Sequence, residues 1–146
     1  MRDRMMAFMQ TFLTQASELA CVENAQGTHR ALTCASRLLR HLSDMGLAPL
    51  EDELECLADY LSILKVRFGN RFHLAAFRAE ELFVERGSVV SFVDEHIDVE
   101  RLLNDPDTEY YIDCERHLNV AQGIVLRVHV RECGERAAEA VCDLQL

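Results

Sequence analysis

Apolar side chains in the N-terminal half of the chain recur at spacings of three and four residues, the period of an amphipathic helix. This pattern predicts three helices, over residues 3–22, 29–45 and 50–68. Thr28 is expected to cap the second helix, and Pro49 to open the third. The third helix has acidic side chains in its first turn and basic ones in its last, which suits the helix dipole.

Beyond the third helix, apolar and polar residues alternate, which is typical of strands. Strands are expected at 71–78, 110–114, 123–133 and 135–146, with a helix capped by Ser88 at 89–104 and a hairpin turn at Gly134. Helices followed by strands predict an α+β fold: an N-terminal helical hairpin or bundle, then a small mixed or antiparallel sheet with one packed helix.

The acidic composition argues against partners that are themselves negatively charged. The formal net charge is −10, which disfavours nucleic acid and anionic membrane surfaces, because both require clustered lysine and arginine. No apolar run approaches the ~20 residues of a membrane span, and the N-terminus lacks a signal-peptide layout. The six cysteines show no C-x-x-C spacing, so neither a zinc ribbon nor a thioredoxin-type motif is indicated. We expect them to be buried, reduced thiols. We therefore expect a cytoplasmic protein without a membrane segment.

One block of the sequence is specific enough to suggest a family. The stretch PLEDELECLADYLSILKVRFGNRF, which begins at Pro49, resembles the segment that follows the phosphoacceptor hairpin in LytS-type sensor histidine kinases. The matching residues are Pro49, Leu50, Glu53, Leu54, Tyr60, Leu61, Ile63, Arg67, Phe68, Gly69 and Arg71. Residues 38–43 and 11–15 extend the resemblance to the preceding helices. It implies a dimerisation-type hairpin at 1–48, followed at 49–146 by a linker helix and a partial, degenerate ATP-binding domain of the GHKL type.

The departures from the family pattern concern the catalytic positions. Thr11 stands where the resemblance places the phosphoacceptor histidine, and Gln15 replaces its paired asparagine. The vestigial nucleotide boxes fall on Asp94 and Glu95, with Glu95 in place of the magnesium-binding asparagine, and on Asp143, which no glycine turn follows. We therefore expect neither ATP hydrolysis nor autophosphorylation, no catalytic residue and no cofactor.

Two sets of residues remain as candidate sites, and no histidine or carboxylate pair has the spacing of a metal site. The first helix is richer in Met and Phe than a short hairpin needs, which suggests a homodimer interface. That interface would comprise Met5, Phe8, Met9, Phe12, Leu13 and Leu38. His29 and His41 are candidate phosphoacceptors on the second helix.

These features favour a non-catalytic, histidine-kinase-like regulatory protein of two-component signalling, with a kinase or a response regulator as its partner. Two alternatives stay open. One is a phosphotransferase that relays phosphoryl groups through His29 or His41, and the other is a fragment of an active sensor kinase.

Overall fold

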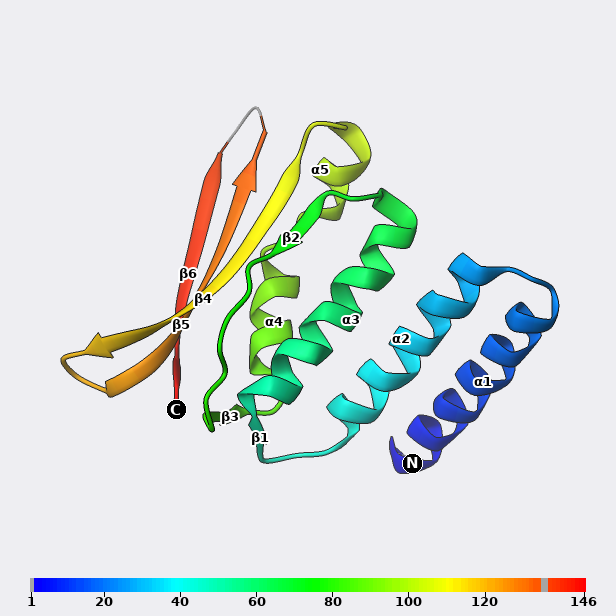
Figure 1. Ribbon diagram of the computed structural model, residues 1–146, viewed down its shortest axis with the longest axis horizontal. Helices are drawn as coiled ribbons and strands as arrows, with labels where there is room; N and C mark the ends of the chain where they lie inside the picture. Colours follow the sequence, from blue (N-terminus) through cyan, green and yellow to red (C-terminus); the bar gives the residue numbers. More distant parts are fainter. Residues whose placement is uncertain (1, 135–136) are drawn as a thin grey trace.

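A computed structural model describes residues 2–134 and 137–146 of the chain. It confirms the α+β class, with helices first and a small mixed sheet after them. Figure 1 shows the elements in a row: α1 lies at one side, α2 and α3 follow, and the sheet lies at the far side, with α4 between α3 and the sheet. The first helix is therefore the element farthest from the sheet.

The three expected helices are present as α1 (Arg2–Val22), α2 (Gln26–Ser43) and α3 (Leu50–Phe68). The third matches its expected bounds because Pro49 (φ −55°) precedes it and Gly69 (φ +77°) ends it. The second begins earlier than expected. Thr28 lies inside α2 and is not its cap, and no side chain caps this helix.

Four strands form the main sheet in the order β2-β4-β5-β6. Their bounds are β2 Phe72–Leu74, β4 Glu109–Asn119, β5 Gly123–Cys133 and β6 Ala138–Gln145. The β2–β4 pair is parallel and the other pairs are antiparallel. A separate two-stranded ladder joins β1 (Leu47–Pro49) to β3 (Phe83–Glu85), and it holds the start of α3 beside the start of α4.

Two of the expected strands differ in extent. The strand expected at 71–78 is only three residues long, because its ladder to β4 ends at Leu74 and the chain then leaves the sheet. The strand expected at 110–114 continues to Asn119, since the whole of β4 pairs with β5. Gly134 lies between β5 and β6 as expected, but the rest of that connection, residues 135–136, falls outside the described residues.

The single helix expected at 89–104 is in fact two, α4 (Ser88–Glu95) and α5 (Val99–Asn104). Asp98 causes the division: its backbone is extended, and its side chain accepts a hydrogen bond from the N–H of Arg101 at 3.1 Å. That is the geometry of an N-cap, so a new helix starts there. Gly87, rather than Ser88, occupies the N-cap position of α4.

The core lies between the helices α3 and α4 and one face of the sheet, here called the inner face. Phe72 of β2 and Tyr110 of β4 are fully buried and stack with ring centroids 6.1 Å apart. Burial raises the pKa of Tyr110 to about 12, and its hydroxyl donates to buried Glu132 at 3.0 Å. Even-numbered residues of β5 and β6 share the inner face, whereas the odd-numbered ones point to the outer face.

Candidate functional site

Thr11, expected at the phosphoacceptor position from the sequence resemblance, lies on an exposed face of α1. The Thr11 hydroxyl donates to the backbone oxygen of Ala7 at 3.0 Å, one turn earlier in the same helix. Gln15 is exposed one turn later. A threonine hydroxyl has no nitrogen, so Thr11 cannot form a phosphoramidate.

The three residues expected at vestigial nucleotide positions do not converge on one site. Asp94 and Glu95 lie on α4, and the carboxylate of Asp94 accepts a hydrogen bond from the Tyr60 hydroxyl at 2.6 Å. Burial of Tyr60, together with this bond, raises the pKa of its phenol. Asp143 instead lies on the outer face of the sheet, and both of its oxygens bond Arg127, at 2.6 and 2.8 Å. The three carboxylates thus serve separate local contacts.

His29 is held in one orientation by the end of α1. Its Nδ1 lies 2.9 Å from the backbone oxygen of Ser17 and 2.9 Å from the Ser17 hydroxyl. A carbonyl oxygen can only accept, so Nδ1 carries the ring proton and Nε2 carries the lone pair. Among the described residues, none bonds Nε2. A hollow of about 380 Å³ lies beside the ring and is also lined by Arg30 and Arg37.

His41 has a different environment, because both of its ring nitrogens are occupied. Arg86 donates to Nδ1 at 3.3 Å, so Nε2 carries the proton and bonds the carboxylate of Glu53. Glu53 is fully buried and also accepts from the backbone N–H of Gly87 at 2.7 Å. This cluster connects α2, α3 and the start of α4. Its geometry leaves no lone pair of His41 open to a phosphoryl group.

The first helix carries two apolar stripes, and only one of them is covered. The covered stripe faces α2 at spacings of four and three, with two polar members that include the buried Ser17; its residues are Met6, Gln10, Leu13, Ser17 and Ala20. The other stripe repeats at spacings of three and four and is exposed along its whole length; its residues are Met5, Phe8, Phe12, Gln15, Leu19 and Val22.

Of the six residues expected at a dimer interface, four lie on or beside this exposed stripe: Met5, Phe8, Met9 and Phe12. Leu13 lies in the covered stripe, and Leu38 packs against the core. Two features of the structure were not predicted from the sequence. The spacing of the exposed stripe around Gln15 was visible in the sequence, whereas the buried cluster around Glu53 had no sequence signal, since Glu53 reads as an ordinary first-turn acid.

A comparison with family models matches residues 7–72 to the histidine kinase family, a little less than half of the chain. The matched segment covers most of α1, then α2 and α3, and ends at the first residue of β2. It supports a relationship of these helices to the histidine kinases of two-component signalling. No curated protein matches the chain significantly. Within the described residues, no helix is long and apolar enough to cross a bilayer.

Proposed function

We propose that the chain is a non-catalytic regulatory protein of cytoplasmic two-component signalling, which pairs with a second copy of itself through α1. The observation that carries the proposal is the exposed stripe of α1. The side chain of Phe8 is 64% exposed and that of Phe12 is 53% exposed, on a helix that already packs its other stripe against α2. Large aromatic side chains left open in a row mark an interaction surface.

The spacing of the stripe favours a second copy as its occupant. A repeat of three and four residues is the a/d pattern of helices that pack side by side in a bundle. The covered and exposed stripes begin at consecutive residues, Met6 and Met5, so they lie about 100° apart around the helix. A helix of a four-helix bundle contacts two neighbours in this way. Gln15, the one polar position in the stripe, would fix the register of the pair.

Two substitutions and the contacts of one further residue support the absence of kinase chemistry. Thr11 cannot accept a phosphoryl group in the manner of a histidine, and Glu95 replaces an asparagine with a carboxylate that repels nucleotide phosphates. Asp143 is engaged with Arg127 on the outer face of the sheet. A chain that keeps the pairing helices and lacks these groups would act by contact, binding a partner kinase or a response regulator.

Substitutions on the stripe test the pairing. The double variant Phe8→Glu/Phe12→Glu places charges on the stripe, whereas Leu103→Glu/Leu118→Glu places them on exposed leucines elsewhere. Light scattering after size exclusion should show a monomer for the first variant and a dimer for the second. Equal masses for the two variants would contradict the proposal. Calorimetry with ATP and magnesium tests the proposed absence of kinase activity. Micromolar binding of ATP would reopen the alternative that the chain is part of an active kinase.

The geometry of His29 favours a second candidate function, a phosphotransferase. Its fixed ring lies beside a hollow that is also lined by Arg30 and by Arg37, which pairs with Asp59. Arginines are the residues that best hold phosphoryl oxygens. Nε2 would attack the phosphorus of an aspartyl phosphate on a response regulator, the bond from phosphorus to the aspartate oxygen would break, and the carboxylate would leave. The proton stays on Nδ1, where the Ser17 carbonyl holds it.

Incubation with a response regulator phosphorylated on aspartate separates the two functions. A phosphotransferase would acquire an acid-labile label that His29→Gln abolishes and His41→Gln retains. The absence of any label on the wild-type chain would end this second candidate and leave the regulatory function standing.

A further inference from the structure

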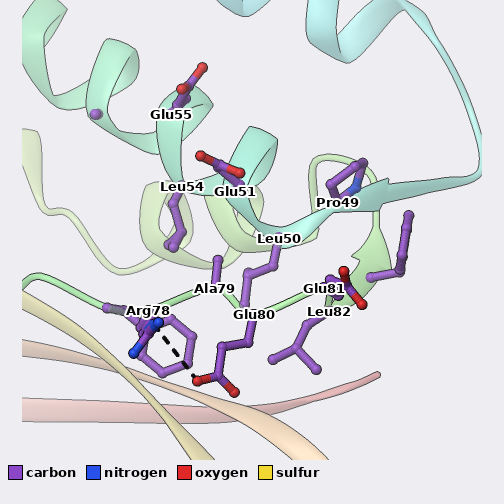
Figure 2. Close-up of a pocket in the computed structure, with 13 residues that line it drawn as sticks. Pro49, Leu50, Glu51, Leu54, Glu55, Arg78, Ala79, Glu80, Glu81 and Leu82 are labelled. Carbon is purple, nitrogen blue, oxygen red and sulfur yellow. Dashed lines mark ion pairs between the residues drawn. The ribbon is translucent and has the colours of Figure 1, made fainter.

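A large cavity of the described structure is separate from α1 and from His29. It has a volume of about 1030 Å³ and lies between the first half of α3 and the segment 77–83 that connects β2 to β3. Its apolar lining comes from both sides, and Figure 2 shows Leu54 of α3 directed toward Ala79 of the facing segment. Phe83 is half exposed at one end. We call this cavity the α3 groove.

Four carboxylates and a single guanidinium line the α3 groove. The guanidinium, Arg78, pairs with Glu80, as the dashed line in Figure 2 marks, and Glu80 also pairs with Arg116. The other three carboxylates, those of Glu51, Glu55 and Glu81, are exposed and form no ion pair within the described part of the chain. The groove therefore combines apolar walls with unneutralised negative charge at its rim.

We propose that the α3 groove binds an amphipathic helix of a partner protein that carries lysine or arginine beside its apolar residues. The apolar walls can cover such a helix, as in other helix-in-groove complexes. The charge at the rim excludes phosphates, nucleic acid and acidic peptides, and it attracts cations. The volume of about 1030 Å³ lies just above the range for small-molecule pockets, about 300–1,000 Å³, which favours a peptide segment over a metabolite.

This surface is independent of the pairing through α1, because its lining residues are Pro49, residues of α3 and residues of the segment 77–83. The probe is a fluorescein-labelled synthetic helix of leucine and lysine, with all its leucines on one face. A second helix has the same leucines and glutamate in place of lysine. Anisotropy is measured with the full chain, and also with Phe8→Glu/Phe12→Glu, so that binding to the exposed stripe of α1 is recognised.

Charge-matched variants locate the binding. Glu51→Gln/Glu55→Gln/Glu81→Gln should weaken binding of the lysine helix about tenfold, as expected for the loss of a few rim ion pairs. The control Glu18→Gln/Glu23→Gln/Glu100→Gln removes the same charge from exposed positions elsewhere and should change binding less than about twofold. Methyl NMR shifts on binding should fall on Leu54 and Leu82.

Three results would overturn the proposal. Equal weakening by the two triple variants would mean that the probe responds to net charge alone. Equal affinity for the glutamate helix would mean that the rim takes no part. Shifts confined to α1, or binding abolished by Phe8→Glu/Phe12→Glu, would place the probe on the pairing stripe.

Discussion

The carboxylate of Glu53, on α3, accepts a hydrogen bond from the backbone N–H of Gly87 at 2.7 Å, where the chain enters α4. The side chain of Glu53 is fully buried and lies beside His41 and Arg86. A negative group at a helix N-terminus satisfies an otherwise open N–H and suits the helix dipole. One buried carboxylate thus joins the second helix of the hairpin to the helix that covers the sheet.

Removal of this carboxylate should be costly. Glu53→Ala leaves the N–H of Gly87 and the Nε2–H of His41 without their buried acceptor, so the free energy of unfolding should fall by about 3–5 kcal/mol. Urea denaturation followed by circular dichroism measures it. Glu55→Ala, an exposed position on the same helix, should change stability by no more than about 0.5 kcal/mol. A similar small effect at Glu53 would contradict the structural role of the cluster.

Two glycines should respond in opposite directions to alanine. Gly87 has φ +79°, a conformation that costs an alanine about 1–2 kcal/mol, and its added methyl would meet a side-chain methyl of Leu42 at 2.8 Å. Gly27 lies within α2 with no atom near an added methyl, so Gly27→Ala should stabilise by about 0.5–1 kcal/mol. Thermal unfolding of the two variants checks the contrast, and a neutral Gly87→Ala would refute the conformation assigned to that residue.

Arg71 should not tolerate lysine. Its guanidinium donates to the backbone oxygens of Leu102 and Thr108, both at 2.7 Å, and to that of Asp105, so it closes the C-terminal end of α5. A single ammonium group cannot span these acceptors, so Arg71→Lys should lower the free energy of unfolding by about 1.5–3 kcal/mol. Arg40→Lys, at an exposed position of α2, is the control. Equal stability of the two variants would show that the bonds contribute nothing.

Acid should lower the stability of the folded state, because it protonates Asp143 on the outer face of the sheet. Hydrogen bonds from Arg127 and Asn119 lower the pKa of Asp143 from its ordinary value of 3.8 to about 2. A lowered carboxyl pKa stabilises the folded state above pH 3.8, and this contribution is lost as the pH falls toward 2. In Arg127→Gln the carboxyl resonance of Asp143 should titrate closer to 3.8, as carbon-detected NMR would record. An unchanged midpoint would exclude Arg127 as the cause.

The sequence predicted the helices well because their signals are local. The bounds of α3 follow from Pro49, Gly69 and the period of its apolar residues. The Asp98 cap that divides α4 from α5 was equally local and was overlooked. The length of β4 could not be predicted, because the apolar and polar residues of its second half alternate only weakly. Its length is set by pairing with β5.

The candidate site was predictable to a smaller extent. The excess of Met and Phe in α1 suggested an interface, but two stripes share that helix, and only tertiary packing shows that the one with Phe8 and Phe12 stays open. His29 and His41 look alike in the sequence. Their difference arises from Ser17 and Glu53, residues twelve positions away that only the fold brings into contact.

Dimerisation through α1 is tested most directly by the native mass of the wild-type chain, measured by sedimentation equilibrium over a range of micromolar concentrations. Pairing through the exposed stripe of α1 predicts twice the 16.7 kDa of one chain, with dissociation on dilution. A strict monomer of 16.7 kDa at every concentration would contradict the proposal that a second copy covers this stripe.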